Sequence, residues 1–212
     1  LTLGFTDASF EAMSGITTTG STVLTGLDDM APGLLLWRAL LQWLGGIGII
    51  VMAIAVFPML RVGGMQLFRM ESSDHAEKAL PRAAQIAAAI GAIYLLLTGI
   101  WAIAYWGAGM SGFEAILHSM TTIATGGFST SDRSLAYFNS PAIDAIAVFG
   151  MIVGALPFIL YLKMAQGNFR VMAADSQVRW FLSLVVAAVA VAMAWLWLDN
   201  GYEPLWALRY AS

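Results

Sequence analysis

Long apolar runs separated by short polar segments dominate this chain. Four of the runs can cross the ~30 Å hydrocarbon core of a bilayer at ~1.5 Å per helical residue, and they cover residues 34–60, 83–107, 142–161 and 180–198. Two further helix-like runs, around Phe10 and Phe113, are too short to span a bilayer. We therefore expect four spans and two short helices that enter the membrane part-way.

Capping residues mark the starts of the two short helices. Thr6 or Asp7 can cap the first, which we expect to end near Ile16. Ser111 and Glu114 fit a capping box at the start of the second. Each helix contains the tripeptide Phe-Glu-Ala followed by a methionine. More residues separate the tripeptide from that methionine in the second helix than in the first. The second short helix is therefore predicted to be about one turn longer.

Prolines and polar residues occur at the starts of the spans and inside them. Pro81 suits the first turn of the 83–107 span, and Ser140 with Pro141 supplies an N-cap and a first-turn proline for the next one. Pro157 lies inside that span and should kink or unwind it. An interfacial aromatic belt is predicted at the end of the 83–107 span, formed by Trp101, Tyr105 and Trp106. Arg38, near the start of the first span, is expected to snorkel to the interface.

A polar, Thr/Gly-rich segment follows each short helix. Backbone carbonyls and Thr hydroxyls can replace the water shell of a dehydrated cation, and Gly permits the backbone angles that turn carbonyls toward one axis. A single segment of this kind is more often a helix C-cap, but its repetition in an apolar chain favours a cation pore. The predicted ion-binding residues are Thr18, Thr19, Gly20, Thr125, Gly126 and Gly127.

Composition excludes several classes of function. Hydrophobic residues make up 59% of the chain, charged residues only 11%, and the mean hydropathy is +0.77, which indicates a polytopic membrane protein. With no Cys there is no thiol catalyst or disulfide framework. A net charge of -3 without a basic tract does not suggest nucleic acid. The spans carry no paired carboxylates or Ser with a base, so we expect no enzyme and no cofactor.

Three segments resemble a known family. Residues 10–22, 118–130 and 57–69 are similar to the Trk/Ktr/HKT superfamily of potassium-uptake proteins, closest to the bacterial TrkH-type pore-forming subunit, and the resemblance covers essentially the whole chain. It implies an all-α polytopic membrane protein in which repeats of span, pore helix, filter and span surround a pseudo-fourfold cation pore. About half of that pore is expected in this chain.

The resemblance also divides the chain into repeats. We expect a second repeat without its first span at 1–60, a cytoplasmic connection at 61–82, and a third repeat with a broken last span at 83–163. Residues 164–212 are expected to hold another cytoplasmic connection, then the first span and the start of the pore helix of a fourth repeat. The chain is accordingly predicted to be an excerpt of a longer protein.

The function implied is potassium uptake across the bacterial inner membrane, with K⁺ bound at the six residues named above. An intramembrane loop is expected to gate the pore, and its predicted residues are Gly150, Gly154, Ala155 and Pro157. The implied partners are membrane lipid, a second copy of the full-length subunit and a cytosolic, nucleotide-binding TrkA-like regulatory subunit. No nucleic acid partner is expected.

Lys and Arg predict the orientation. Residues 61–82 and 163–179 hold seven of the ten Lys and Arg residues, so the positive-inside rule places both loops in the cytoplasm and the filters toward the periplasm. Two alternatives stay open beside potassium uptake. One is a Na⁺-permeable or ion-coupled secondary transporter, for which inverted halves would be typical; the other is a non-conducting structural fragment.

Overall fold

The computed structural model describes residues 4–51, 76–198, 203, 206 and 209, and the regular structure within them is helical. The helices are α1 (Phe5–Ile16), η1 (Leu27–Asp29), α2 (Pro32–Val51), α4 (Ala76–Gly107), α5 (Gly112–Ile123), η3 (Ser134–Tyr137), α6 (Pro141–Ala155), α7 (Phe158–Ala165), α8 (Arg170–Ala174) and α9 (Ser176–Leu198). In this part of the chain, two segments are long and apolar enough to cross a membrane, Gln85–Gly107 and α9, and a third results if α6 and α7 form one bent span. The predicted all-α membrane architecture is confirmed.

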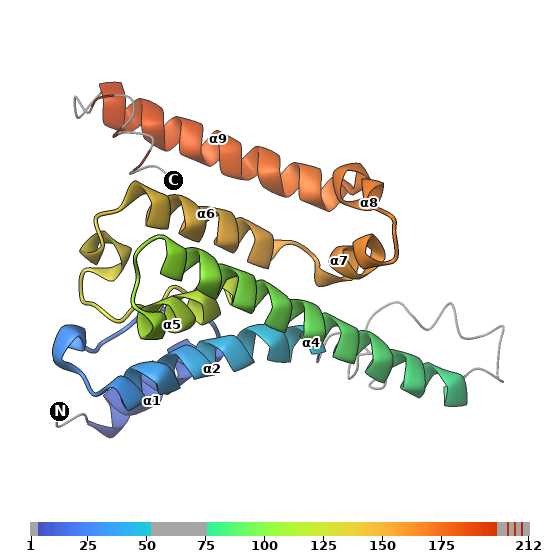
Figure 1. The fold of residues 1–212 in the computed structure, drawn as a ribbon, viewed down its shortest axis with the longest axis horizontal. Coiled ribbons are helices and arrows are strands. Elements are labelled where there is room, and N and C mark those ends of the chain that lie inside the picture. The colour runs from blue at the N-terminus through green and yellow to red at the C-terminus, as the bar shows by residue number, and fades with distance from the viewer. Residues whose placement is uncertain (1–3, 52–75, 199–202, 204–205, 207–208, 210–212) are drawn as a thin grey trace.

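The short helix α5 lies at the centre of the fold. It packs against α4, α2 and α6, and α1 packs against α2 (Figure 1). Helix α9 runs along the outer side of α6 in Figure 1, and residues of both helices line one cavity. Two long helices and one bent helix thus surround the short helix from which the second Thr/Gly-rich segment emerges.

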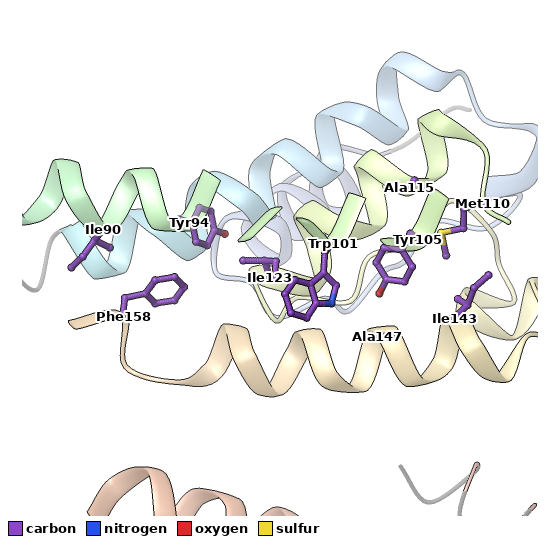
Figure 2. Close-up of a cluster of buried hydrophobic side chains, with 10 residues drawn as sticks. All are labelled: Ile90, Tyr94, Trp101, Tyr105, Met110, Ala115, Ile123, Ile143, Ala147 and Phe158. Carbon is purple, nitrogen blue, oxygen red and sulfur yellow. The ribbon is translucent and has the colours of Figure 1, made fainter. Parts of the chain in front are cut away.

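A buried cluster of α4, α5, α6 and α7 residues holds this arrangement together (Figure 2). Trp101 and Tyr105 belong to it, at 7% and 0% exposure, so their predicted place in an interfacial belt is wrong. Their polar ends have partners inside the fold: Trp101 Nε1 donates to Ile146 O at 2.9 Å, and Tyr105 Oη lies 2.8 Å from Thr122 Oγ1. A buried aromatic residue with a satisfied polar tip favours the core. Trp106, at 66% exposure, remains available to the interface.

Two spans begin earlier than predicted. Helix α4 starts at Ala76, so Pro81 lies inside the helix and not in its first turn. A proline removes one hydrogen bond there but does not by itself end the helix. Helix α9 starts at Ser176, because Asp175 Oδ1 accepts from Gln177 N at 2.8 Å and from Val178 N at 3.2 Å and so satisfies free N–H groups at the helix start.

The predicted break at Pro157 is confirmed. Helices α6 and α7 meet there at an angle of 88°. At its other end α6 begins as expected, with Ser140 at the N-cap and Pro141 in the first turn. Tyr161 Oη donates to Val153 O at 2.7 Å across the break, and the same carbonyl accepts from Leu156 N at 3.3 Å, so two donors stabilise the end of α6.

Glycines of α2 and α6 bring these helices onto the ends of the two short helices. A Cβ on Gly45 would overlap the carbonyl oxygen of Ile16, and one on Gly154 would lie 2.5 Å from the carbonyl oxygen of Ile123. Ile16 and Ile123 are the last residues of α1 and α5. The same close backbone contact therefore supports each short helix at its C-terminus.

Some predictions fall outside the described residues. They are the end of the 34–60 span, residues 61–75 of the first connection, and most of the pore-helix start expected at the end of residues 164–212.

Candidate ion-binding site

Two loops of matching geometry follow the short helices. Helices α1 and α5 are both 12 residues long. Each position of α1 corresponds to the position 107 residues later in α5, so that Phe5 is equivalent to Gly112. We call residues 17–22 the first loop and residues 124–129 the second loop. In the first, Thr18 and Gly20 have φ of 56° and 78°; in the second, Thr125 and Gly127 have 55° and 80°. The two loops therefore alternate in the same way between left-handed and ordinary backbone.

Hydrogen bonds repeat with the same offset. Thr19 N donates to Ser14 O at 3.0 Å, and Gly126 N donates to Thr121 O at 2.9 Å. The next N–H group turns back to the same carbonyl in both loops, at 3.5 Å for Gly20 and 3.4 Å for Gly127. Successive N–H groups directed at the short helix hold each loop against the helix that precedes it.

The repeat register corrects one prediction. With the 107-residue offset, Glu11 corresponds to His118 and not to the glutamate of the second Phe-Glu-Ala tripeptide, so these tripeptides are not equivalent. The second short helix is not one turn longer, as the tripeptides suggested. The register is set at the loop end of each helix, where the left-handed residues and their bonds to the helix recur.

The two loops contact each other. A Cβ on Gly20 would overlap the carbonyl oxygen of Gly126, so the backbones touch where the first loop has a left-handed glycine. Gly20 and Gly127 line one cavity of about 360 Å³ together with Thr22, Asp132 and other outer-loop residues. We call this the outer cavity. The structure thus brings one predicted glycine of each loop, Gly20 and Gly127, to the same cavity.

A second cavity of about 280 Å³ adjoins the second loop at Thr125. It is lined by Thr125 and by apolar residues of α6 and α9, among them Met151, Ala155 and Phe181. We call this the inner cavity. The second loop therefore runs from an apolar cavity at Thr125 to a more polar one at Gly127.

Arg38 does not reach the membrane interface. The residue is 2% exposed, and it donates from Nε to Glu11 Oε1 at 2.8 Å and from Nη2 to Thr22 Oγ1 at 3.1 Å. It also donates to Ser129 O at 3.3 Å, and its guanidinium lies 4.2 Å from the ring centroid of Phe128. The prediction of snorkelling is wrong because Glu11 and the ends of both loops provide partners inside the fold.

The contact of Gln42, one helical turn beyond Arg38, with the second loop was also not predicted from the sequence. Gln42 is 0% exposed, and its Oε1 accepts from Phe128 N at 3.1 Å. Two polar residues four positions apart in an apolar run lie on one face of a helix, which is the signal that could have identified both. This face of α2 binds consecutive residues of the second loop, Phe128 and Ser129.

Glu11 and His118 occupy equivalent positions and make equivalent contacts. Glu11 Oε1 accepts from Thr22 Oγ1 at 2.9 Å, and His118 Nε2 lies 3.1 Å from Ser129 Oγ. Thr22 and Ser129 are themselves related by the 107-residue offset. In each unit, a buried polar side chain of the short helix thus fixes the last residue of its loop.

Asp132 joins the segments that follow the two loops. Its carboxylate accepts from Leu27 N at 3.0 Å and from Gly26 N at 2.7 Å. These N–H groups, Leu27 first, lower the pKa of Asp132 below its ordinary value of 3.8, and the charge of Arg38 acts in the same direction. A carboxylate therefore stays ionised at the wall of the outer cavity, where it favours cations over anions.

The four predicted gate residues divide into two kinds. A Cβ on Gly150 would overlap Trp101 and lie 2.5 Å from Thr122 Cγ2, so this glycine, like Gly154, is a site of close helix packing. Ala155 ends α6 and lines the inner cavity, and Pro157 is the N-cap of α7. The break in the helix therefore adjoins the cavity beneath the second loop.

Comparison with known proteins identifies similar chains. Residues 1–203 match the TrkH family of cation transport proteins. The chain is 46% identical over 194 residues to the Trk system potassium uptake protein TrkI of Halomonas elongata, covering 91% of this chain and 39% of that protein. It is 43% identical over 204 residues to the Trk system potassium uptake protein TrkH of Salmonella typhimurium, covering 95% and 42%. The crystal structure of the potassium transporter TrkH from Vibrio parahaemolyticus matches with a TM-score of 0.86 and 39% identity, covering 99% of this chain and 42% of that chain. The chain thus spans about two fifths of the length of these relatives.

Proposed function

Given that this chain belongs to the TrkH family of cation transport proteins, we propose that the full-length protein takes up potassium across the bacterial inner membrane through a filter to which these two loops contribute. The proposed ion ligands are backbone and hydroxyl oxygens of the loops, at Thr18, Thr19, Gly20, Thr125, Gly126 and Gly127. Relatives named as potassium uptake proteins support K⁺ as the transported ion.

The observation that carries this proposal is the shared backbone geometry of two loops that meet at one cavity. Left-handed residues at alternate positions turn the backbone in a way that an extended or helical segment cannot. The loop N–H groups bond to the short helices, and the helix C-termini add negative dipole ends near the loops. Carbonyl and hydroxyl oxygens with a favourable electrostatic field suit a dehydrated monovalent cation.

The two cavities define the proposed route. Ions would enter the outer cavity past Asp132, pass the loops, and reach the inner cavity at Thr125. The α6–α7 break would gate this route at the inner cavity. Ala155 and Pro157 would belong to the moving segment, and Gly150 and Gly154 would form its packing contacts. The 88° bend beside the inner cavity supports this assignment.

The remaining parts of the proposal concern the whole protein. The loops face the periplasm, residues 61–82 and 163–179 lie in the cytoplasm, and residues 1–60, 83–163 and 164–212 belong to three successive repeats. A dimer of full-length subunits and a cytosolic TrkA-like regulatory subunit are the proposed partners. The Lys and Arg distribution supports the orientation, and the names of the Trk system relatives support a multi-component system.

The test is ion selectivity in the full-length protein. Gly20→Ser and Gly127→Ser are expressed in bacteria that depend on this transporter for K⁺, and the uptake of K⁺ and Na⁺ is compared with that of the unchanged protein. We expect both variants to lose discrimination of K⁺ against Na⁺. Unchanged selectivity in both would refute the assignment of the loops, and an unchanged protein that prefers Na⁺ would favour the sodium-permeable alternative.

A further inference from the structure

We infer that Gln42 is a specificity-determining positioning residue, which sets the spacing between the two loops and thereby the preference for K⁺. The inference rests on the proposed function, since it concerns the selectivity of the same site. Gln42 would act through the backbone of the loops and contact no ion.

The carboxamide of Gln42 is held on the second loop. Its Oε1 accepts from Phe128 N at 3.1 Å, and Phe128 directly follows Gly127. A Cβ on Gly126 would lie 2.5 Å from Oε1 and 2.7 Å from Nε2 of Gln42. The carboxamide therefore fills the space that the absent side chain of residue 126 leaves open.

The orientation of the carboxamide follows from this contact. Phe128 N–H requires an acceptor, so Oε1 and not Nε2 bonds to this group of the second loop. Nε2 lies 3.5 Å from the position that a Cβ on Gly20 would take, so the carboxamide also neighbours the first loop. Gln42 thus bonds to the second loop with its oxygen, and its nitrogen lies near the glycines of both loops, at Gly126 and Gly20.

Nε2 is buried and has no hydrogen-bond partner among the described residues. A buried donor of this kind is costly, and native proteins retain few of them. Packing alone would be served as well by Met or Leu, which carry no polar atoms. The polar group at this position, beside the contact of Gly20 with the Gly126 carbonyl, indicates a role in setting the geometry of the loops.

Spacing between the loops bears directly on selectivity. Discrimination between K⁺ and Na⁺ depends on the size of the oxygen cage and on the number and freedom of its carbonyls. A residue that fixes the second loop relative to the first controls the size of this cage and the freedom of its carbonyls. A merely structural residue would change the amount of folded protein and its maximal transport rate, and would leave the ratio of K⁺ to Na⁺ uptake unchanged.

The first variant is Gln42→Met in the full-length protein, which keeps length and removes both polar atoms. We expect the ratio of K⁺ to Na⁺ uptake to fall about tenfold, which corresponds to about 1.4 kcal/mol less discrimination between the two ions. Leu44→Met, on an exposed position of the same helix, is the matched control and should keep the ratio. A ratio within twofold of the unchanged protein in Gln42→Met would overturn the inference.

The second test is a pair of variants that does not depend on Gln42→Met accumulating in the membrane. Gly126 is outside the left-handed region, so Ala is resisted there mainly by the Gln42 carboxamide. Gly126→Ala and Gln42→Ala should each reduce selectivity, and the double variant should lose less than the sum of the two losses, because the missing carboxamide makes room for the alanine. Effects of the two changes that simply add would refute the coupling.

The two proposals fail in different ways. An unchanged full-length protein that does not select K⁺ removes the proposed function. A K⁺-selective protein whose selectivity is insensitive to both Gln42 tests removes only the role of Gln42.

Discussion

Glu11 and Arg38 form an ion pair of 2.8 Å in which both side chains are almost fully buried, at 8% and 3% exposure. Glu11 comes from the first short helix and Arg38 from α2, and Arg38 also contacts the ends of both loops, at Thr22 and Ser129. One charged pair therefore ties the first unit to the loop of the second. A buried pair of this kind is costly to break, because the remaining charge loses its partner.

Removing Arg38 should destabilise the protein strongly. Arg38→Met leaves the Glu11 carboxylate buried without its partner, which typically costs about 3–5 kcal/mol. The measurement is the thermal unfolding of the purified full-length protein in detergent. Arg133→Met, in an exposed outer loop, is the control and should change the unfolding temperature little. Equal unfolding temperatures for the two variants would contradict the structural role of the pair.

Gly20 and Gly127 should differ in their tolerance of alanine. Both have positive φ, so Ala at either position carries the left-handed penalty of about 1–2 kcal/mol. At Gly20 the new Cβ would also overlap the Gly126 carbonyl, whereas no described atom lies within 4 Å of a Cβ on Gly127. Gly20→Ala should therefore lower both stability and K⁺ uptake more than Gly127→Ala does. Measured unfolding temperatures and uptake rates in the opposite order would argue against this contact between the loops.

Acid should loosen the contact that Asp132 makes. Its pKa is lowered by the N–H groups of Leu27 and Gly26, so its contribution is fully present above the ordinary value of 3.8 and is lost as the pH falls through the lower folded value. Hydrogen exchange at these two amides should accelerate in that range, beyond the intrinsic pH dependence of exchange.

The Asp132→Asn variant should show the loosened contact at neutral pH. The amide that replaces the carboxylate carries no charge and accepts from only one oxygen, so the amides of Gly26 and Leu27 should exchange faster at pH 7. Asp7→Asn, in the first turn of α1, is the control and should leave both amides protected. Protection that survives Asp132→Asn would show that the carboxylate does not hold this turn.

Tyr161 should stabilise the broken helix without affecting selectivity. Tyr161→Phe removes the hydrogen bond to Val153 O across the break, a loss of about 1 kcal/mol or somewhat more. We expect a lower unfolding temperature and an altered rate of K⁺ uptake, with the K⁺ to Na⁺ ratio unchanged. Tyr137→Phe, on an exposed outer residue, is the matched control. A changed ion ratio in Tyr161→Phe would indicate that the break also shapes the loops.

Several features could be predicted from sequence because they are local. The apolar runs identify the spans, the Ser111–Glu114 capping box starts α5, and Pro157 ends α6 early, since each depends on neighbours within a few positions. The Thr/Gly segments were recognisable for the same reason. Left-handed backbone at Gly20 and Gly127 is a property that the residue type itself permits.

The register of the repeat required the structure. The Phe-Glu-Ala tripeptides suggested an alignment four residues away from the observed one, because sequence similarity within a helix does not identify the residue at which it ends. The loops do so, through the hydrogen bonds of Thr19 and Gly126 to the helices that precede them. The burial of Trp101 and Tyr105 likewise depended on partners from other helices.

The sequence by itself determined the class of protein, the two Thr/Gly loops and the broken helix, because hydrophobic length, glycine content and proline position act locally. Only the tertiary structure decided that Arg38 and Gln42 lie inside, beside both loops. A polar residue in an apolar run is stable either at the interface or in the core. It lies in the core only where a charged or hydrogen-bonding partner is present. Here Glu11 and the backbone of the second loop are those partners, and they come from elements far apart along the chain.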